Sequence, residues 1–286
     1  MRPTERPEAA AGDKRPGFPL RLPANQGGPS VNKRIFGSNA SNVADGYKPL
    51  QPLQPKHAVL GLQKPMPAGV GLDSQTVRSR MVEKLARQGV QDAVVLAAMG
   101  QVERHRFVDT ALANQAYEDT SLPIGLGQTI SKPNVVARML ELLREGKGTD
   151  VRLGRVLEIG TGCGYQAAVL SHLASEVYSI ERLRGLHEKA RENLRHFRLA
   201  NVHLLFGDGM EGFARGAPYA AIIAAAGGEA IPPAWIEQLA VGGRLVAPMQ
   251  TAGGQQALVV IDKTAQGIRQ SVLEAVHFVP LKSGTN

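Results

Sequence analysis

A glycine-rich turn lies between a short apolar run, residues 156–159, and a helical pattern that begins at Tyr165. Its sequence is Gly160-Thr161-Gly162-Cys163-Gly164. Glycine lets the backbone turn sharply and lets a ligand approach the main chain closely. The free N–H groups at the start of the following helix favour an anionic or polar ligand group. Residues 160–164 are therefore a candidate loop for binding a nucleotide-like molecule, although an ordinary strand-to-helix turn can have the same composition.

The spacing of the glycines narrows the class of ligand. The dinucleotide-binding fingerprint G-x-G-x-x-G, counted from Gly160, needs a glycine at the position of Tyr165. The third glycine is instead Gly164, and an acidic residue, Glu158, precedes the first glycine. This pattern resembles motif I of class I methyltransferases, and the resemblance implies S-adenosyl-L-methionine as the cofactor. It places these residues at the cofactor site: Glu158, Gly160, Thr161, Gly162 and Gly164.

Two further acidic residues follow the next two apolar runs. Glu181 comes 21 residues after Gly160, where a carboxylate can accept hydrogen bonds from both ribose hydroxyls of a nucleoside. Asp208 lies between Gly207 and Gly209, so its carboxylate could accept a hydrogen bond from an adenine amine while the glycines leave room for the ring. Each residue also has a simpler explanation, since Glu181 could be a solvated strand end and Asp208 a turn residue. The glycine loop, Glu181 and Asp208 follow three successive predicted strands, and together they indicate a cofactor site more specifically than any one of them does alone.

The elements that must hold these residues follow an alternating pattern. Five apolar runs indicate strands, over residues 156–159, 177–180, 202–206, 219–225 and 244–249. Helical stretches lie between them, over residues 165–174, 183–200 and 232–239. The alternation predicts an α/β fold, a doubly wound Rossmann-like methyltransferase sheet that is mostly parallel and covered by helices on both faces. Residues 257–261 and 268–276 lack a helix between them and predict an antiparallel edge. Ligands of such sheets bind beyond the carboxyl ends of the strands.

The segment upstream of the sheet supplies the clue to the substrate. The stretch Ser121-Leu122-Pro123-Ile124-Gly125-Leu126-Gly127-Gln128-Thr129-Ile130-Ser131-Lys132-Pro133 resembles the substrate loop of the protein-L-isoaspartate O-methyltransferases. Residues 106–109, 156–166, 207–209 and 278–281 also resemble that family, so the resemblance covers about residues 74–281. It implies an enzyme that methylates the free carboxylate of L-isoaspartyl residues in damaged proteins and so initiates their repair.

The resemblance also implies roles for individual residues. Ser131 matches the active-site serine of the family, while Gln128, Thr129 and Ile130 match positions that line the cofactor and the substrate. A carboxylate acceptor is already ionised at pH 7, because its reference pKa is about 3.3–3.9. The enzyme must therefore mainly orient the acceptor, and we expect no Ser-His-Asp triad. Ser131 could instead, or in addition, cap the helix that begins at Pro133.

The N-terminal part of the chain differs in composition from the rest. Residues 1–72 contain 11 of the 18 prolines, with 10 basic and 4 acidic residues. Because its apolar residues are isolated, we expect a disordered basic, proline-rich extension, or alternatively a basic arm that contacts an acidic partner or nucleic acid. Residues 73–286 form the expected catalytic domain. This domain starts with small helices, one with an apolar stripe at Val77, Met81 and Leu85, then passes through an irregular stretch at residues 117–129.

The overall composition excludes several classes of protein. No run approaches the roughly 18–20 apolar residues of a membrane span, and the first residues are charged rather than apolar. The single cysteine, Cys163, suits a reducing compartment, and no zinc-binding spacing is present. Residues 73–286 hold 23 basic and 21 acidic residues, which gives no reason to expect a nucleic-acid groove there. We expect a cytoplasmic monomer that binds no metal. Two alternatives to the isoaspartyl methyltransferase function stay open: a methyltransferase that acts on a small molecule or RNA, and a cofactor-binding scaffold without enzyme activity.

Overall fold

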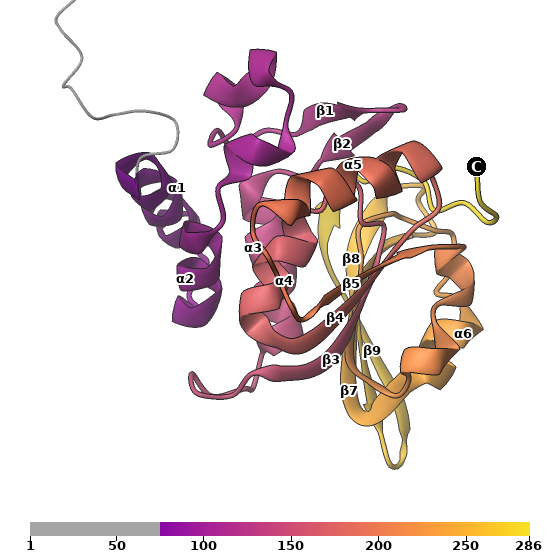
Figure 1. Cartoon of the computed structure of the whole chain (residues 1–286). Coiled ribbons are helices and arrows are strands. Elements are labelled where there is room, and N and C mark those ends of the chain that lie inside the picture. Colours follow the sequence, from indigo (N-terminus) through magenta and orange to yellow (C-terminus); the bar gives the residue numbers. More distant parts are fainter. Residues whose placement is uncertain (1–74) are drawn as a thin grey trace, which may run out of the picture. The chain divides into compact units, whose positions relative to one another are not determined.

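The computed structural model describes residues 75–286 (Figure 1). The predicted extension, residues 1–72, lies outside the described residues. The helices are α1 (Gln75–Arg87), α2 (Ala93–Gln101), α3 (Pro133–Arg144), α4 (Tyr165–Leu173), α5 (Arg184–Arg195) and α6 (Pro233–Gln238). The strands are β1 (Leu122–Gly125), β2 (Gln128–Ile130), β3 (Leu153–Ile159), β4 (Ala174–Glu181), β5 (Val202–Phe206), β6 (Tyr219–Ala224), β7 (Leu239–Gln250), β8 (Gln256–Thr264) and β9 (Gly267–Val276). Short 3₁₀ segments include Arg104–Phe107, Thr110–Gln115 and Gly209–Glu211.

A seven-stranded sheet forms the centre of the described region, in the order β5-β4-β3-β6-β7-β8-β9. The first five strands in this order are parallel, whereas β8 and β9 run antiparallel, as predicted. The last residue of β3, Ile159, pairs with Ile180 of β4 and with Ala224 of β6. This register brings the carboxyl ends of the central strands to one edge of the sheet, where a ligand of a doubly wound fold is expected.

Each face of the central part of the sheet is covered by helices, which explains why the central strands are apolar on both sides. On one face, α3 and α4 pack against strands and α2 packs outside them (Figure 1). The core on that face includes Val156 of β3 and Ile223 of β6. On the opposite face, Trp235 of α6 packs with Leu157 of β3. Alternate residues of one strand therefore belong to different cores, and β3 is fixed on both sides.

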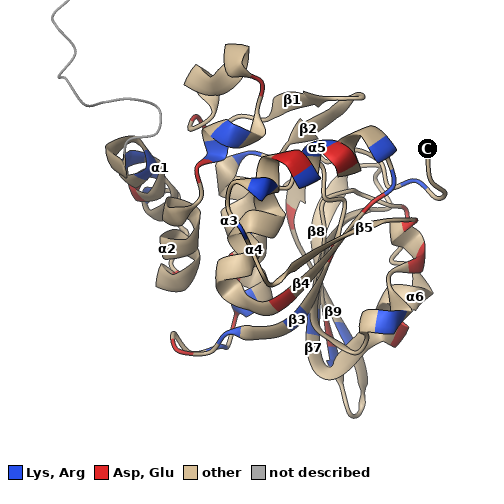
Figure 2. Cartoon of the chain, viewed as in Figure 1, with Lys and Arg blue, Asp and Glu red and all other residues tan. Residues whose placement is uncertain are grey.

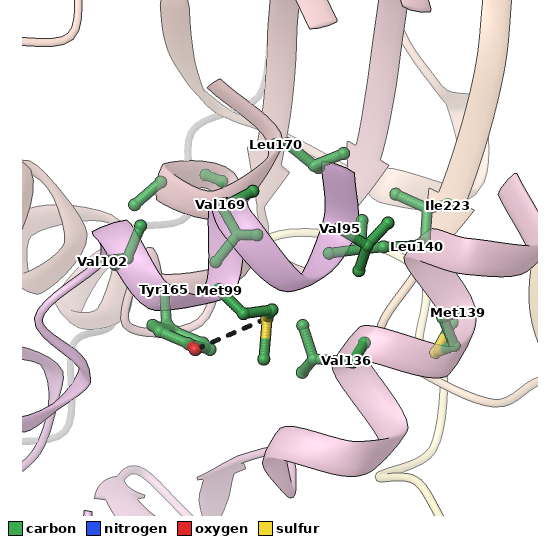
Figure 3. Close-up of a cluster of buried hydrophobic side chains, with 14 of the residues drawn as sticks. Val95, Met99, Val102, Val136, Met139, Leu140, Tyr165, Val169, Leu170 and Ile223 are labelled. Carbon is green, nitrogen blue, oxygen red and sulfur yellow. Dashed lines mark hydrogen bonds between the residues drawn. The ribbon is translucent and has the colours of Figure 1, made fainter. Parts of the chain in front are cut away.

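The upstream helices complete the first of these cores. The Asp92 carboxylate caps α2 by accepting hydrogen bonds from the N–H groups of Val94 and Val95. From α2, Val95 and Met99 point toward apolar side chains of α3 and α4 (Figure 3). The upstream helices are thus part of the same packed body as the sheet and support the elements that face its edge.

One segment differs from the expectation drawn from the sequence. The sequence predicts an irregular stretch over residues 117–129, but residues 122–130 form an antiparallel hairpin of β1 and β2. The two residues of its turn, Leu126 and Gly127, have φ values of 52° and 70°, as a tight type I′ turn requires. A leucine rarely adopts a positive φ, so the sequence did not indicate this turn.

Candidate active site

A cavity of about 480 Å³ lies at the carboxyl edge of the sheet, and two structures contribute most of the predicted site residues that line it. The first, here called the loop wall, consists of residues 160–164 with Glu181 and Gly209. The second, here called the hairpin wall, consists of residues 124–131. All of the site residues expected from the sequence line this cavity except three: Glu158, Gly164 and Asp208. The tertiary fold therefore brings together two motifs that are separated along the chain.

The glycines of the loop wall adopt backbone conformations that other residues avoid. The φ values of Gly160, Gly162 and Gly164 are 88°, 57° and 93°. A Cβ atom at Gly162 would lie 3.2 Å from the Cδ1 atom of Ile124 in the hairpin wall. A Cβ atom at Gly164, behind the cavity, would lie 3.1 Å from Leu194 of α5. The loop needs glycine both for its conformation and for the close approach of its neighbours.

Glu181 joins the loop wall to the end of β4. Its side chain is 5% exposed, and one carboxylate oxygen accepts a hydrogen bond of 2.9 Å from the N–H of Gly162. The other oxygen accepts one of 2.9 Å from the N–H of Leu183. A carboxylate has about four acceptor positions, so this fixed group retains capacity for two hydroxyl donors from a ligand.

Glu158 supports the loop wall from inside the protein instead of lining the cavity. Its Oε2 atom lies 2.5 Å from the Ser179 hydroxyl, which lies 2.6 Å from the Thr161 hydroxyl. Burial, with a small contribution from the charge of Glu181, raises the pKa of Glu158 from its ordinary value of 4.5 to about 8. Glu158 is therefore mostly protonated at neutral pH and holds Thr161 through this hydrogen-bonded chain.

Asp208 and Gly209 are neighbours in the sequence, but only Gly209 lines the cavity. Gly209 lines the cavity, and a Cβ atom there would lie 2.6 Å from Ile159, so no other residue fits. The Asp208 carboxylate accepts hydrogen bonds from the N–H groups of Met210 and Gly284. In this arrangement Asp208 fastens the C-terminal segment across the end of β5, and its expected contact with adenine stays a prediction.

The hairpin wall presents Gln128, Thr129, Ile130 and Ser131 to the cavity. The residue before α3 is Lys132, and no side-chain hydrogen bond caps this helix. Among residues 75–286, no hydrogen bond uses the Ser131 hydroxyl. The capping role considered for Ser131 therefore has no support in the geometry, and its hydroxyl is available to a ligand.

The sequence did not indicate that the C-terminal segment closes one side of the cavity. Val279 accepts a hydrogen bond of 2.8 Å from Gly227, and Leu281 donates one of 2.8 Å back to Gly227. Farther along, Asn286 donates a hydrogen bond of 2.9 Å to the Arg182 carbonyl. Residues 279–282 and Asn286 line the cavity. Only the family resemblance of residues 278–281 pointed to this segment, and it assigned no role.

Two basic residues that the sequence analysis did not consider anchor the hairpin wall. From α5, Lys189 donates hydrogen bonds of 2.9 Å to the Ile124 carbonyl and 3.0 Å to Asp109. Arg104 donates a hydrogen bond of 2.7 Å to the Ser131 carbonyl. Neither residue belongs to a recognisable motif. Lysine on a charged helix is usually solvated, so only the tertiary contacts identify Lys189.

The charges around the site are mixed. Basic and acidic residues are interspersed along α5, so this helix does not carry charges of one sign (Figure 2). Within residues 75–286, no group of three His, Cys, Asp or Glu side chains could hold a metal ion. None of the helices in this range is long and apolar enough to cross a membrane.

Comparisons with known sequences agree on one family. A model described as protein-L-isoaspartate(D-aspartate) O-methyltransferase matches residues 76–286. The protein-L-isoaspartate O-methyltransferase of Methylibium petroleiphilum is 57% identical over 273 residues, which cover 95% of this chain and 97% of that protein. The enzyme of the same name from Leptothrix cholodnii is 58% identical over 253 residues, covering 85% and 89%.

Solved structures show the same fold. A protein-L-isoaspartate O-methyltransferase aligns with a TM-score of 0.65 at 27% identity, over 72% of this chain and 66% of that one. A putative member from Plasmodium falciparum, in complex with S-adenosyl-L-homocysteine, aligns with a TM-score of 0.61 at 25% identity, over 72% and 98%. The predicted doubly wound methyltransferase sheet is confirmed.

The family model covers the part of the chain that forms the cavity. The family model begins at residue 76 and continues to the last residue, so it includes both walls of the cavity. The predicted enzyme class, a methyltransferase, is confirmed by the curated relatives. The chain belongs to the protein-L-isoaspartate(D-aspartate) O-methyltransferase family.

Proposed function

We infer that this protein transfers the methyl group of S-adenosyl-L-methionine to the free carboxylate of L-isoaspartyl residues in damaged proteins. Methylation of this carboxylate is the first step in repair of the residue. The observation that carries the inference is that one cavity holds both the loop wall and Ser131 of the hairpin wall, in a chain of this family. A cavity of about 480 Å³ is of the size that small-molecule sites have.

The loop wall fits the proposed cofactor. S-adenosyl-L-methionine supplies a methyl group that its sulfonium has already activated. The glycines at positions 160 and 162 admit a ligand against the main chain, and Glu181 can accept hydrogen bonds from two ribose hydroxyls. Gly209, which has no room for a side chain, suits the flat adenine ring, with Asp208 at its edge as the proposed acceptor from the amine.

The hairpin wall fits the proposed acceptor. The Ser131 hydroxyl, which lacks a partner among the described residues, can donate a hydrogen bond to a carboxylate oxygen and so orient it. Gln128, Thr129 and Ile130 line the space between this acceptor and the loop wall. Because the acceptor is already ionised, no general base is needed, and catalysis consists mainly of holding the reacting groups in line.

The test compares matched peptides with labelled S-adenosyl-L-methionine. Three peptides share one sequence and contain aspartate, isoaspartate, or isoaspartate with its free α-carboxylate converted to an amide. We expect rapid labelling of the isoaspartyl peptide alone. Equal labelling of the aspartyl peptide, or labelling of none, would contradict the proposal. Preferential labelling of a small molecule or RNA would identify a different acceptor.

The setting of the reaction is part of the same proposal. We expect a monomer in the cytoplasm that recognises isoaspartyl proteins and peptides, with nucleic acid contacted at most weakly by the basic residues 1–72. Sedimentation of the full chain at several concentrations tests the expected monomer.

A further inference from the structure

Arg104 is a completely buried arginine directly behind the hairpin wall. Its side chain is 0% exposed. Its Nε atom donates a hydrogen bond of 2.7 Å to the Ala116 carbonyl, and one terminal nitrogen donates one of 2.7 Å to the Ser131 carbonyl. The other terminal nitrogen is buried and has no hydrogen-bond partner, and no carboxylate among residues 75–286 forms a salt bridge with this side chain.

The other fully buried arginine, Arg144, provides a comparison. Its side chain is 1% exposed and its Nε atom lies 3.0 Å from the Asp92 carboxylate. Its terminal nitrogens donate to the carbonyls of Gly148 and Val151. Removing a charge from water costs free energy that a salt bridge partly offsets. Arg144 has that compensation and Arg104 does not, so the burial of Arg104 needs another explanation.

The surroundings of Arg104 connect it with the cavity. The guanidinium carbon lies 4.7 Å from the centre of the Tyr165 ring. Both Tyr165 and Ser131 line the cavity. The Tyr165 hydroxyl is in turn held by the sulfur of Met99, at 3.7 Å (Figure 3). The arginine is therefore fixed between a rigid aromatic ring and the backbone of the residue that faces the acceptor.

The two carbonyls that Arg104 binds lie on either side of the hairpin. Ala116 precedes β1 and Ser131 follows β2, so one guanidinium holds both ends of the segment that forms the hairpin wall. Only arginine combines a planar fork of donors with a long side chain; lysine has a single ammonium group and could not satisfy both carbonyls in the same geometry.

We propose that Arg104 is a positioning residue for methyl transfer, whose fork fixes the Ser131 main chain so that the hydroxyl faces the acceptor. The proposal rests on the function inferred above. It predicts that loss of the fork impairs use of the acceptor while the loop wall, and hence binding of the cofactor, is unchanged.

The experiment uses Arg104→Lys, which keeps a positive charge, and Arg104→Gln, which removes it. Neither can bind both carbonyls at once. We expect kcat/KM for the isoaspartyl peptide to fall on the order of 3- to 10-fold in both, no more than in Ser131→Ala, because small displacements of reacting groups are costly. Affinity for S-adenosyl-L-homocysteine, measured by calorimetry, should change less than about twofold. If one variant fails to fold, the other still provides the test.

Arg144→Lys is the matched control, since it makes the same substitution at an equally buried arginine whose contacts include no cavity residue. We expect it to lower thermal stability without changing kcat/KM. A double-mutant cycle tests the route of action. If Arg104 acts through Ser131, the combination of Arg104→Lys with Ser131→Ala should be scarcely worse than Ser131→Ala alone.

Three results would overturn the proposal. Unchanged kcat/KM in the Arg104 variants would show that the fork is dispensable. A parallel loss of S-adenosyl-L-homocysteine affinity would indicate general structural support, and additive effects with Ser131→Ala would indicate action through another residue. Failure of the inferred function would be seen separately, as a wild-type protein that does not label the isoaspartyl peptide.

Discussion

The two walls of the cavity are held in place by different kinds of contact. The loop wall follows directly from the ends of parallel strands, and the pairing of Ile159 with Ile180 determines its position. The hairpin wall is separate from the main sheet, and side chains from remote segments hold it: Lys189 binds the Ile124 carbonyl and Arg104 the Ser131 carbonyl. We infer that changes in the loop wall affect the cofactor first, whereas loss of a hairpin anchor affects the acceptor and leaves the cofactor bound.

The largest effect is expected where the two walls touch. In Gly162→Val, the side chain would meet Ile124 and the backbone would be strained at φ 57°. We expect affinity for S-adenosyl-L-homocysteine, measured by calorimetry, to fall at least about 100-fold, with loss of activity. The control is Gly89→Val, which has a similar strain at φ 105° with open space around it. Normal affinity in Gly162→Val would show that the loop does not contact the cofactor.

A second substitution tests whether the hairpin wall acts on the acceptor and not on the cofactor. Ser131→Ala removes a hydroxyl that has no partner among residues 75–286. We expect kcat for the isoaspartyl peptide to fall on the order of 10-fold, because one orienting hydrogen bond is lost, with unchanged S-adenosyl-L-homocysteine affinity. Ser79→Ala, at an exposed position in α1 outside both walls, serves as the control. Full activity of Ser131→Ala would remove the proposed role of this residue.

Removing the contact between α5 and the hairpin wall should cause a smaller loss of activity, again without loss of cofactor binding. Lys189→Met keeps the apolar stem but loses hydrogen bonds to Ile124 and Asp109. Peptide kinetics should show a fall in kcat/KM of roughly 3- to 10-fold, while the cofactor analogue binds normally. Lys147→Met replaces an exposed lysine without a side-chain hydrogen bond in the described region and should have no effect. Impaired cofactor binding in Lys189→Met would contradict the independence of the two walls.

The smallest effect concerns the support beneath the loop wall. Because the pKa of Glu158 is raised to about 8 in the folded protein, the folded state keeps a proton that the unfolded chain releases above about 4.5. Stability should therefore decrease as pH rises from about 4.5 to about 8 and then level off. Glu158→Gln has no such titration, so its melting temperature relative to wild type should rise by on the order of 10 °C as the pH increases across that window. If the melting temperatures of Glu158→Gln and wild type change in parallel with pH, Glu158 is not held protonated.

The sequence predicted the loop wall well because the relevant physics is local. The glycine loop, Glu158 and Glu181 all lie at the carboxyl ends of strands whose apolar character is visible in the sequence, and parallel pairing then brings those strand ends together. The sequence could not show that Glu158 lies beneath the loop. Its depth depends on the packing of neighbouring strands, and that packing also raises its pKa.

The hairpin wall was recognised only by resemblance, and its position was decided by the tertiary structure. A turn containing Leu126 at positive φ has no clear signal in the sequence, and the residues that hold the hairpin lie 65 and 27 positions from the carbonyls they bind. Such contacts form only after α5 and the Arg104–Phe107 segment have packed against the same core. The sequence by itself therefore determined the alternation of strands and helices, the position of the glycine-rich loop and the family, since these depend on neighbouring residues. The folded chain alone placed Ser131 and the loop around one cavity, because directional hydrogen bonds between distant segments hold the hairpin there.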